Sequence, residues 1–246
     1  MSGSRSSGTS SYRRLDVARR RAQLIRAALG LFAHRPPEDV SLDDVAAAAE
    51  VSRPLVYRYF PGGKPQLYEA ALRSAVEELT QCFAEPQEGP LSRRLSAALD
   101  RYLAFVDEHD TGFSALLRSG SVVATSRTGA IVDEVRRGAA EHILAHLRVP
   151  EPGVRLRMAV RTWITAVEGA SLGWLDEGKQ PPVEELRDWL LDHFVALLLA
   201  TATGDPQTEE VVSRALAREP ADGPVASLAR RTMTLLTRAE HLLPAP

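Results

Sequence analysis

Apolar residues recur at intervals of three and four along most of the chain, which is the spacing of one buried face of an α-helix. The breaks between these stretches fall at turn formers such as Arg35-Pro36-Pro37 and the segment 86–90. Neither strand-like alternation nor an internal repeat is evident in the sequence. The pattern therefore predicts an all-α protein, with helices over about residues 41–49, 52–60, 65–83, 91–106, 113–119, 127–147, 153–176 and 182–201, a first helix that ends at Arg35, and a last one that opens at Pro224.

The stretch from Ser41 to Phe60 predicts two short helices joined by a tight turn. Ser41 is a good N-cap, and Asp44 follows at the distance of a capping box. Ser52 is a second N-cap candidate, and Pro54 stands in the first turn of the next helix, where its missing N–H costs nothing. Two helices in this arrangement form a helix-turn-helix.

The outward face of the second helix carries Arg53, Tyr57, Arg58 and Tyr59, which supply donors and flat rings suited to a DNA major groove. With these residues in place, the stretch LIRAALGLFAHRPPEDVSLDDVAAAAEVSRPLVYRYFPGGKPQLYEAAL resembles the N-terminal domain of the TetR (tetracycline-repressor) family of bacterial regulators. The resemblance covers roughly residues 20–75. It implies a repressor that binds a palindromic DNA operator as a homodimer and is released by a small-molecule effector.

The resemblance also assigns roles to single residues. It places Ser41 and Tyr57 near phosphates, and Tyr59 and Lys64 near the DNA backbone. Arginine can bond guanine O6 and N7 together, and apolar side chains can touch a thymine methyl group. The base edges are accordingly assigned to Arg53, Pro54 and Leu55, and the complete set of expected DNA-binding residues is Ser41, Ser52, Arg53, Pro54, Leu55, Tyr57, Arg58, Tyr59 and Lys64.

Three positions depart from the family pattern. Pro36 replaces a glycine that usually closes the first helix, and proline cannot adopt the positive φ that glycine provides. Glu50 replaces a glycine within the turn, so it must adopt an unfavourable backbone or change the turn. The loop Pro61–Lys64 is one residue longer than usual. We expect altered local geometry within an intact motif.

Composition and charge are compatible with this interpretation. The 246 residues are 44% hydrophobic and 25% charged, as in ordinary globular proteins. Residues 1–73 hold 12 Lys+Arg and 7 Asp+Glu, a net +5 within a chain of net −2, so one end is suited to a polyanion. A single cysteine, Cys82, and the lack of a signal-peptide or membrane-spanning pattern predict a cytoplasmic protein that does not enter membranes.

The expected domain organisation is a disordered arm (1–12), a DNA-binding domain (13–64) and an effector-binding and dimerisation domain (65–246) with extra helices after about residue 204. Arginines of the segment 13–21 either follow DNA phosphates or belong to a solvated tail. By resemblance, the two helices over 153–201 form the dimerisation pair. Small and bulky residues there predict an interface that includes Gly169, Gly173, Trp189, Phe194 and Leu197.

Aromatic and aliphatic residues between 91 and 175 predict a largely apolar effector pocket with few polar groups, although each of them also fits an ordinary core. The candidates are Tyr102, Phe105, Phe113, Leu116, Leu117, Trp163, Val167 and Trp174. On the same helix as Trp163, the residues Arg161, Thr165 and Glu168 either orient a ligand or face solvent.

Metal and catalytic alternatives are weaker. His142 and His146 stand four apart beside Glu141, but no third ligand is identifiable. Asp192-His193 lacks an accompanying nucleophile motif. We therefore expect no catalytic residues, metal or cofactor. An all-helical enzyme and an interaction protein with an incidental helix-turn-helix remain the alternatives.

Overall fold

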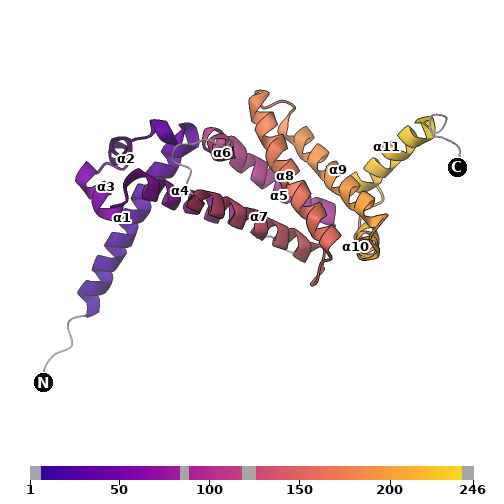
Figure 1. Ribbon diagram of the computed structural model, residues 1–246, viewed down its shortest axis with the longest axis horizontal. Helices are drawn as coiled ribbons and strands as arrows, with labels where there is room; N and C mark the ends of the chain where they lie inside the picture. Colours follow the sequence, from indigo (N-terminus) through magenta and orange to yellow (C-terminus); the bar gives the residue numbers. More distant parts are fainter. Residues whose placement is uncertain (1–6, 84–88, 118–125, 240–246) are drawn as a thin grey trace, which may run out of the picture. The chain divides into compact units, whose positions relative to one another are not determined.

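The computed structural model describes residues 7–83, 89–117 and 126–239, and within them all regular structure is helical (Figure 1). The all-α prediction is confirmed. In chain order the elements are α1 (Ser7–His34), the short 3-10 helix η1 (Pro37–Asp39), α2 (Leu42–Ala48), α3 (Arg53–Tyr59), α4 (Gly63–Phe83), α5 (Leu91–Glu108), α6 (Asp110–Leu117), α7 (Ser126–His146), α8 (Val154–Asp176), α9 (Val183–Ala202), α10 (Pro206–Leu216) and α11 (Pro224–Ala239).

The chain divides into two compact units. The first comprises residues 1–80 and 106–133, and the second comprises residues 81–105 and 134–246. The first unit therefore contains α6 and most of α4 in addition to α1, α2 and α3. The expected boundary between residues 64 and 65 instead assigned residues 65–83 of α4 and the whole of α6 to the larger domain.

The first unit is built around one hydrophobic core that α1, α2, α3 and the start of α4 share. Phe60 and Val56 are fully buried there, and the Phe32 and Tyr68 rings meet edge to face with centroids 4.9 Å apart. Burial raises the pKa of Tyr68 to about 12, so its hydroxyl stays neutral. The buried members of this core are Leu24, Ala28, Phe32, Val40, Leu42, Val45, Ala46, Ala49, Val56, Phe60, Leu67, Tyr68 and Ala71.

A glycine sets the distance between α6 and α1. A Cβ atom at Gly112 would lie 2.4 Å from the carbonyl oxygen of Phe32, closer than real Cβ contacts. Because the obstacle is backbone rather than a flexible side chain, any larger residue would push the two helices apart. Glycine is therefore required at this crossing.

The second unit is organised around the helical hairpin of α8 and α9, which lie side by side (Figure 1). The Trp163 indole donates to the carbonyl oxygen of Leu190 at 3.0 Å, and its ring lies 4.7 Å from that of Phe194. Near the hairpin turn, the Trp174 indole donates to the carbonyl oxygen of Pro181 at 2.8 Å. Each buried indole N–H therefore has a backbone partner in the hairpin, as buried tryptophans require.

The two C-terminal helices pack on α9. Asp205 caps α10 by accepting from Thr208 N at 3.1 Å. Glu219, just past α10, accepts from Ser92 N at 3.0 Å and so connects this helix to the start of α5. Further along, Arg231 of α11 pairs with Asp192 of α9. The chain beyond residue 204 thus continues the fold of the second unit.

Several helix boundaries differ from the sequence prediction. Helix α1 extends back to Ser7, so residues 7–12, expected to be disordered, are helical. Helix α4 begins at Gly63 rather than Pro65, and α6 begins at Asp110 rather than Phe113. Ser119, the expected end of α6, lies outside the described residues.

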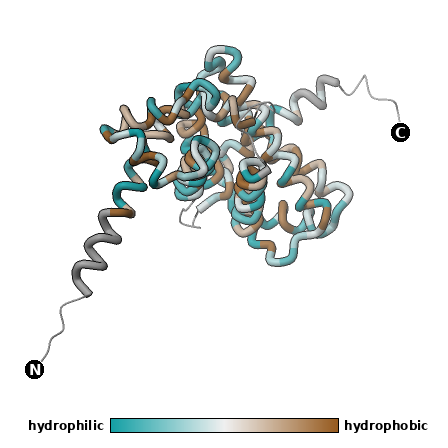
Figure 2. The backbone as a smooth tube through the Cα atoms, turned by 60° about the vertical axis from the view of Figure 1, so that its left-hand side comes forward, coloured by the Kyte–Doolittle hydropathy of each residue, from teal (hydrophilic) through white to brown (hydrophobic). Residues whose placement is uncertain are grey.

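In the coloured parts of Figure 2, hydrophilic and hydrophobic residues are interspersed along the helices. Among the helices of the described ranges, none has the combination of length and apolar character that a membrane span requires.

Candidate nucleic-acid interface

Helix α2, the first helix of the helix-turn-helix, begins from a well-formed N-cap. Ser41 N donates to Asp44 Oδ2 at 2.8 Å, and Asp44 N donates to Ser41 Oγ at 3.1 Å. This reciprocal pair is the predicted capping box, which is confirmed. The hydrogen bond that Ser41 Oγ donates to Asp44 Oδ2 at 2.7 Å, then the one from Ser41 N and the charge of Arg35, lower the pKa of the Asp44 carboxyl below its ordinary value.

The turn itself depends on an unusual backbone at Glu50. Its φ is 54°, in the left-handed region that favours glycine. In this conformation Val51 N donates to the carbonyl oxygen of Ala46 at 2.9 Å and Glu50 N to that of Ala47 at 3.0 Å. Glu50 therefore keeps the turn that a glycine would give and takes the unfavourable backbone conformation, one of the two expected outcomes.

The other two departures are also accommodated locally. Pro36 has φ −52° and precedes η1, where its carbonyl oxygen accepts from Asp39 N at 3.0 Å. A 3-10 turn thus replaces the usual left-handed closure of α1. In the longer loop before α4, Gly63 adopts φ 67°, so a glycine absorbs the additional residue.

Helix α3 has one buried and one exposed side. Val56 is completely buried, and Phe60 directly after the helix is buried too, which fixes this side in the core. Ser52 occupies the N-cap position with extended backbone, but its side chain makes no capping hydrogen bond. The Ser52 hydroxyl is therefore available at the exposed start of the helix, and Pro54 lies at the first turn as predicted.

Arg53 and Tyr57 form a pair on the exposed side of α3. The Arg53 guanidinium carbon lies 5.7 Å from the centre of the Tyr57 ring, and Arg53 Nη1 lies 3.1 Å from Asp43 Oδ2 of α2. The hydrogen bond with Tyr57, and then the charge of Asp43, raise the pKa of Arg53 above its ordinary value. Both side chains are exposed, so these contacts connect Arg53 to α2 and to Tyr57 without covering it.

The remaining candidates differ in exposure. Arg58 is exposed on α3, whereas Leu55 and Tyr59 are half-buried, and Tyr59 packs against the core of the first unit. Lys64 at the start of α4 donates from Nζ to the carbonyl oxygen of Glu38 at 2.9 Å. Lys64 is therefore tied to η1 in the free protein.

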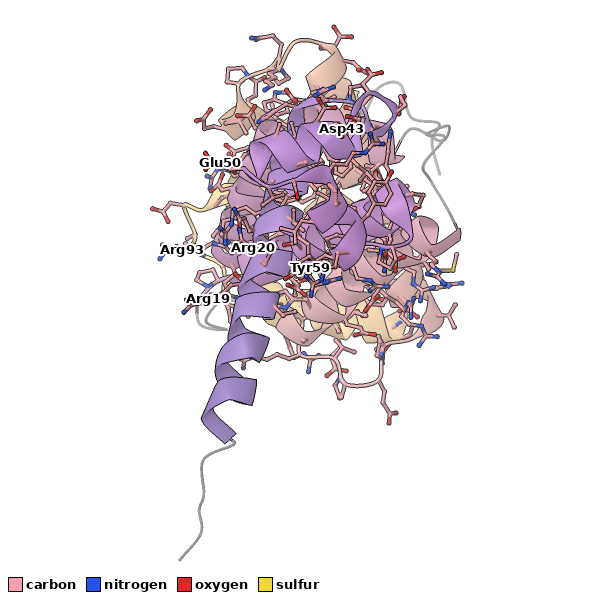
Figure 3. All side chains as sticks on the ribbon, turned by 90° about the vertical axis from the view of Figure 1, so that its left-hand side faces the viewer. Arg19, Arg20, Asp43, Glu50, Tyr59 and Arg93 are labelled. Carbon is pink, nitrogen blue, oxygen red and sulfur yellow. The ribbon has the colours of Figure 1, made fainter. Side chains whose placement is uncertain are left out.

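Figure 3 shows Arg19 and Arg20 projecting from α1, with Asp43 and Glu50 at the two ends of α2. Arg20 Nη1 donates to Gln23 Oε1 at 2.8 Å, and Gln23 Nε2 donates to the carbonyl oxygen of Ala49 at 2.8 Å. Gln23 and Asp43 contribute to the site and were not among the residues predicted from the sequence. Their partners are 26 and 10 residues away, beyond what helical periodicity indicates.

The predicted effector-pocket residues are divided between the two units. Phe113, Leu116 and Leu117 lie on α6 of the first unit, and the others lie in the second: Tyr102, Phe105, Trp163, Val167 and Trp174. Trp163 is used as a core residue of the hairpin, because it is buried between Leu190 and Phe194. Trp174 also lines an open groove beside Gly173 and Trp189.

The predicted dimer residues separate into two groups. Gly169, Gly173 and Trp189 lie on the exposed side of the hairpin, and Leu197 is half-buried. Phe194 was predicted for the interface, but this assignment is wrong, because its side chain is 1% exposed and packs on Trp163 inside its own subunit. Apolar residues cover more than one side of α9, so periodicity alone did not separate the inner side from the outer one.

Comparison with known proteins agrees with this geometry. Residues 24–71 match the family model described as "Bacterial regulatory proteins, tetR family", and residues 91–197 match "Tetracyclin repressor-like, C-terminal domain". A crystal structure of a TetR-family transcriptional regulator from Streptomyces coelicolor has 48% sequence identity and a TM-score of 0.85. The alignment covers 89% of this chain and 98% of that one.

The helix-turn-helix and the helical second unit define the class: a DNA-binding transcriptional regulator. Within that class, the chain belongs to the TetR family. The family consists of transcriptional regulators rather than enzymes.

Curated relatives match over a shorter stretch. The transcriptional activator FasR of Mycolicibacterium smegmatis is 29% identical over 111 residues, which is 44% of this chain and 50% of that protein. An HTH-type transcriptional repressor of Mycobacterium tuberculosis is 37% identical over 81 residues, which is 33% of this chain and 41% of that protein. This chain thus spans half or less of the length of the curated relatives that it matches.

Proposed function

We propose that the protein is a repressor that binds a palindromic operator as a homodimer, with α3 of each subunit in a major groove. The observation that carries this proposal is the exposed pair of Arg53 and Tyr57 on α3, held by Asp43 at 3.1 Å from Arg53. The planar guanidinium fork of an exposed arginine presents two parallel donors that match guanine. Arg53 would exchange the carboxylate of Asp43 for O6 and N7 of a guanine.

The other residues follow from their positions around this pair. Pro54 and Leu55 at the start of α3 are proposed to touch base edges, and Tyr57 is proposed to reach a phosphate. The remaining phosphate and backbone contacts are assigned to Ser41, Ser52, Arg58, Tyr59 and Lys64. In the free protein Lys64 Nζ donates to the carbonyl oxygen of Glu38. To contact DNA, Lys64 either breaks this hydrogen bond or keeps it and donates a second one to a phosphate.

A homodimer is supported by the outer side of the hairpin. A Cβ atom added at Gly169 or Gly173 would meet nothing within 4 Å, and Trp189 is 50% exposed. Small residues beside an exposed tryptophan suit the close approach of a second helix pair. Two subunits joined there would form a four-helix bundle and present two copies of α3 to half-sites about 34–36 Å apart.

We propose that a small molecule relieves repression by binding to the second unit. Tyr102 is buried there on α5, and Arg136 Nη2 of α7 lies 2.8 Å from Glu168 Oε2 of α8. Burial, the largest influence, raises the pKa of Tyr102, so its hydroxyl stays neutral. This polar cluster among apolar side chains could fix the orientation of a largely apolar effector. Effector binding would then change the distance between the two copies of α3 and weaken operator binding.

Because its target is bacterial chromosomal DNA, we place the protein in the cytoplasm. The experiment that tests the proposed function is fluorescence anisotropy with DNA from upstream of the coding sequence, titrated at several salt concentrations. We expect two chains per duplex and an affinity that falls steeply with salt. Binding of one chain per duplex, or equal affinity for any DNA, would reject the proposal.

A further inference from the structure

A small cavity in the second unit is enclosed by the start of α5, the end of α7 and helix α10. Its volume is about 70 Å³, enough for a phosphate or carboxylate group but far below the 300–1,000 Å³ of sites that enclose drug-sized ligands. The residues that line it are Gly89, Leu91, Arg94, His146, Leu147, Arg148, Val211, Arg214, Ala215 and Arg218.

The lining is strongly and uniformly basic. Four arginines and one histidine face the cavity, and no aspartate or glutamate is among the lining residues. Arg214 pairs with Glu210 at 3.8 Å on the exposed side of α10. Within the described part of the chain, Arg94, Arg148 and Arg218 have no ion-pair partner. Like charges gathered in this way repel one another unless an anion enters.

Arg94 shows the imbalance most clearly. Its Nη2 donates to the carbonyl oxygen of His146 at 3.4 Å, while Nε and Nη1 are buried and, among the described residues, have no hydrogen-bond partner. Buried guanidinium donors without partners are uncommon, because their desolvation is then uncompensated. Burial, and then the charge of Arg148, lower the pKa of Arg94.

The carboxylate that acts on Arg94 is already engaged elsewhere. Glu219 partly offsets the positive charge around Arg94, but both of its oxygens accept hydrogen bonds from Ser92. Glu219 makes no hydrogen bond to the buried Nε or Nη1 of Arg94, and no other residue in the described ranges accepts from them.

Helix ends explain part of this arrangement. Arg148 follows the C-terminus of α7 with φ 55°, and Arg214 and Arg218 stand around the C-terminus of α10. Cations are favoured at helix C-termini. That preference accounts for each arginine by itself. It does not account for four of them around one cavity, nor for two buried donors on Arg94 that no residue of the described ranges satisfies.

We propose that this cavity is a binding site for the phosphate group of a phosphorylated small molecule, or for inorganic phosphate itself. The planar guanidinium fork matches phosphate oxygens with two parallel hydrogen bonds, which favours arginine over lysine in such sites. The site goes beyond the proposed DNA-binding function, because it uses none of the residues assigned to DNA or to the dimer.

The test uses the full chain and inorganic phosphate. Thermal unfolding is followed in chloride buffer at constant ionic strength, with phosphate raised to about 10 mM, and calorimetric titration measures the affinity. Binding to the folded state predicts a saturable rise in Tm of about 2–4 °C. Acetate at the same concentration should give a smaller rise. If glycerol phosphate raises Tm as much as inorganic phosphate does, the natural ligand is a phosphorylated small molecule. If glycerol phosphate raises Tm less, the ligand is the free phosphate ion.

Two variants and two controls locate the effect. Arg94→Gln and Arg148→Gln should each abolish the rise, and the exposed Arg148 keeps the test valid if Arg94→Gln unfolds. Arg137 is an exposed residue of α7 outside the cavity, and Arg53 lies in the first unit. The variants Arg137→Gln and Arg53→Ala should therefore show the same phosphate-dependent rise in Tm as the wild type. An equal rise in Arg148→Gln and Arg137→Gln, or a rise that never saturates, would overturn the proposal. Operator binding by Arg148→Gln should stay unchanged, so this result is separate from the proposed repressor function.

Discussion

The side-chain amide of Gln23 donates to the carbonyl oxygen of Ala49 at 2.8 Å and so joins α1 to the turn that orients α3. Ala49 is the C-cap of α2, and Glu50 with its left-handed backbone follows directly. This hydrogen bond from α1 adds to the packing of Val56 and Phe60 in holding the turn, and with it α3, in place.

Replacing Gln23 tests this connection. We expect Gln23→Ala to lower the free energy of unfolding by about 1 kcal/mol, because a half-buried carbonyl oxygen loses its donor. Operator affinity should fall as well, since α3 is held less firmly. Chemical denaturation and anisotropy measure the two effects. Gln81→Ala, an exposed glutamine of α4, should change neither.

The capping box gives a pH-dependent prediction. Ser41→Ala should cost about 1 kcal/mol at pH 7, since α2 loses its N-cap. The hydrogen bonds of Ser41 lower the pKa of Asp44 from its ordinary 3.8, so this part of the stability is present above that value. It is lost as pH falls through the lowered pKa of the folded state. Denaturation curves should show that the free energies of unfolding of Ser41→Ala and the wild type become more similar below about pH 4. A difference that widens in acid would contradict the assignment.

Two substitutions of Glu50 separate the effect of its backbone strain on stability from the effect of its charge on DNA affinity. Glu50→Gly should stabilise the fold by about 1 kcal/mol, because glycine adopts φ 54° without the cost that a side chain brings. It also removes an acid near DNA phosphates, so affinity should rise at low salt. Glu50→Gln changes the charge and keeps the side chain. It should therefore raise affinity with little change in Tm, and a similar gain in Tm for both variants would exclude backbone strain as the cause.

The dimer is tested by filling the space above a glycine. A Cβ atom at Gly169 meets nothing within the subunit, so Gly169→Leu should fold normally. In the proposed four-helix bundle the leucine would hold the partner's helices apart and weaken dimerisation by roughly 10-fold or more. Sedimentation equilibrium measures this change. Gly138→Leu on α7 is the matched control, because its Cβ position is also open. Equal dissociation constants for both variants would place the interface elsewhere.

Local features were predictable from the sequence, and contacts between distant segments were not. The capping box and the turn around Glu50 join residues three to five positions apart, a range in which side-chain type and spacing determine hydrogen bonding. By contrast, Gln23 meets Ala49 and Lys64 meets Glu38 across 26 residues each. Such contacts follow from the packing of helices, which periodicity does not specify.

The same reason explains the misassigned Phe194 and the unforeseen basic cavity. Helical periodicity shows that α9 has apolar sides, but which side faces Trp163 depends on the crossing with α8. Arg94, Arg148 and Arg218 lie on or after three different helices, and in sequence each appears as an ordinary surface charge. Their convergence became visible only through the fold.

The most direct test of the central claim is the ratio of affinities for the inverted-repeat operator and a scrambled duplex, measured for the wild type and Arg53→Ala at one salt concentration. If α3 reads bases through Arg53, the variant should lose roughly 10- to 100-fold on the operator and little on the scrambled duplex. The loss should be confined to one base position in each half-site. Equal losses on both duplexes would show that Arg53 contacts only the phosphate backbone and would contradict the account.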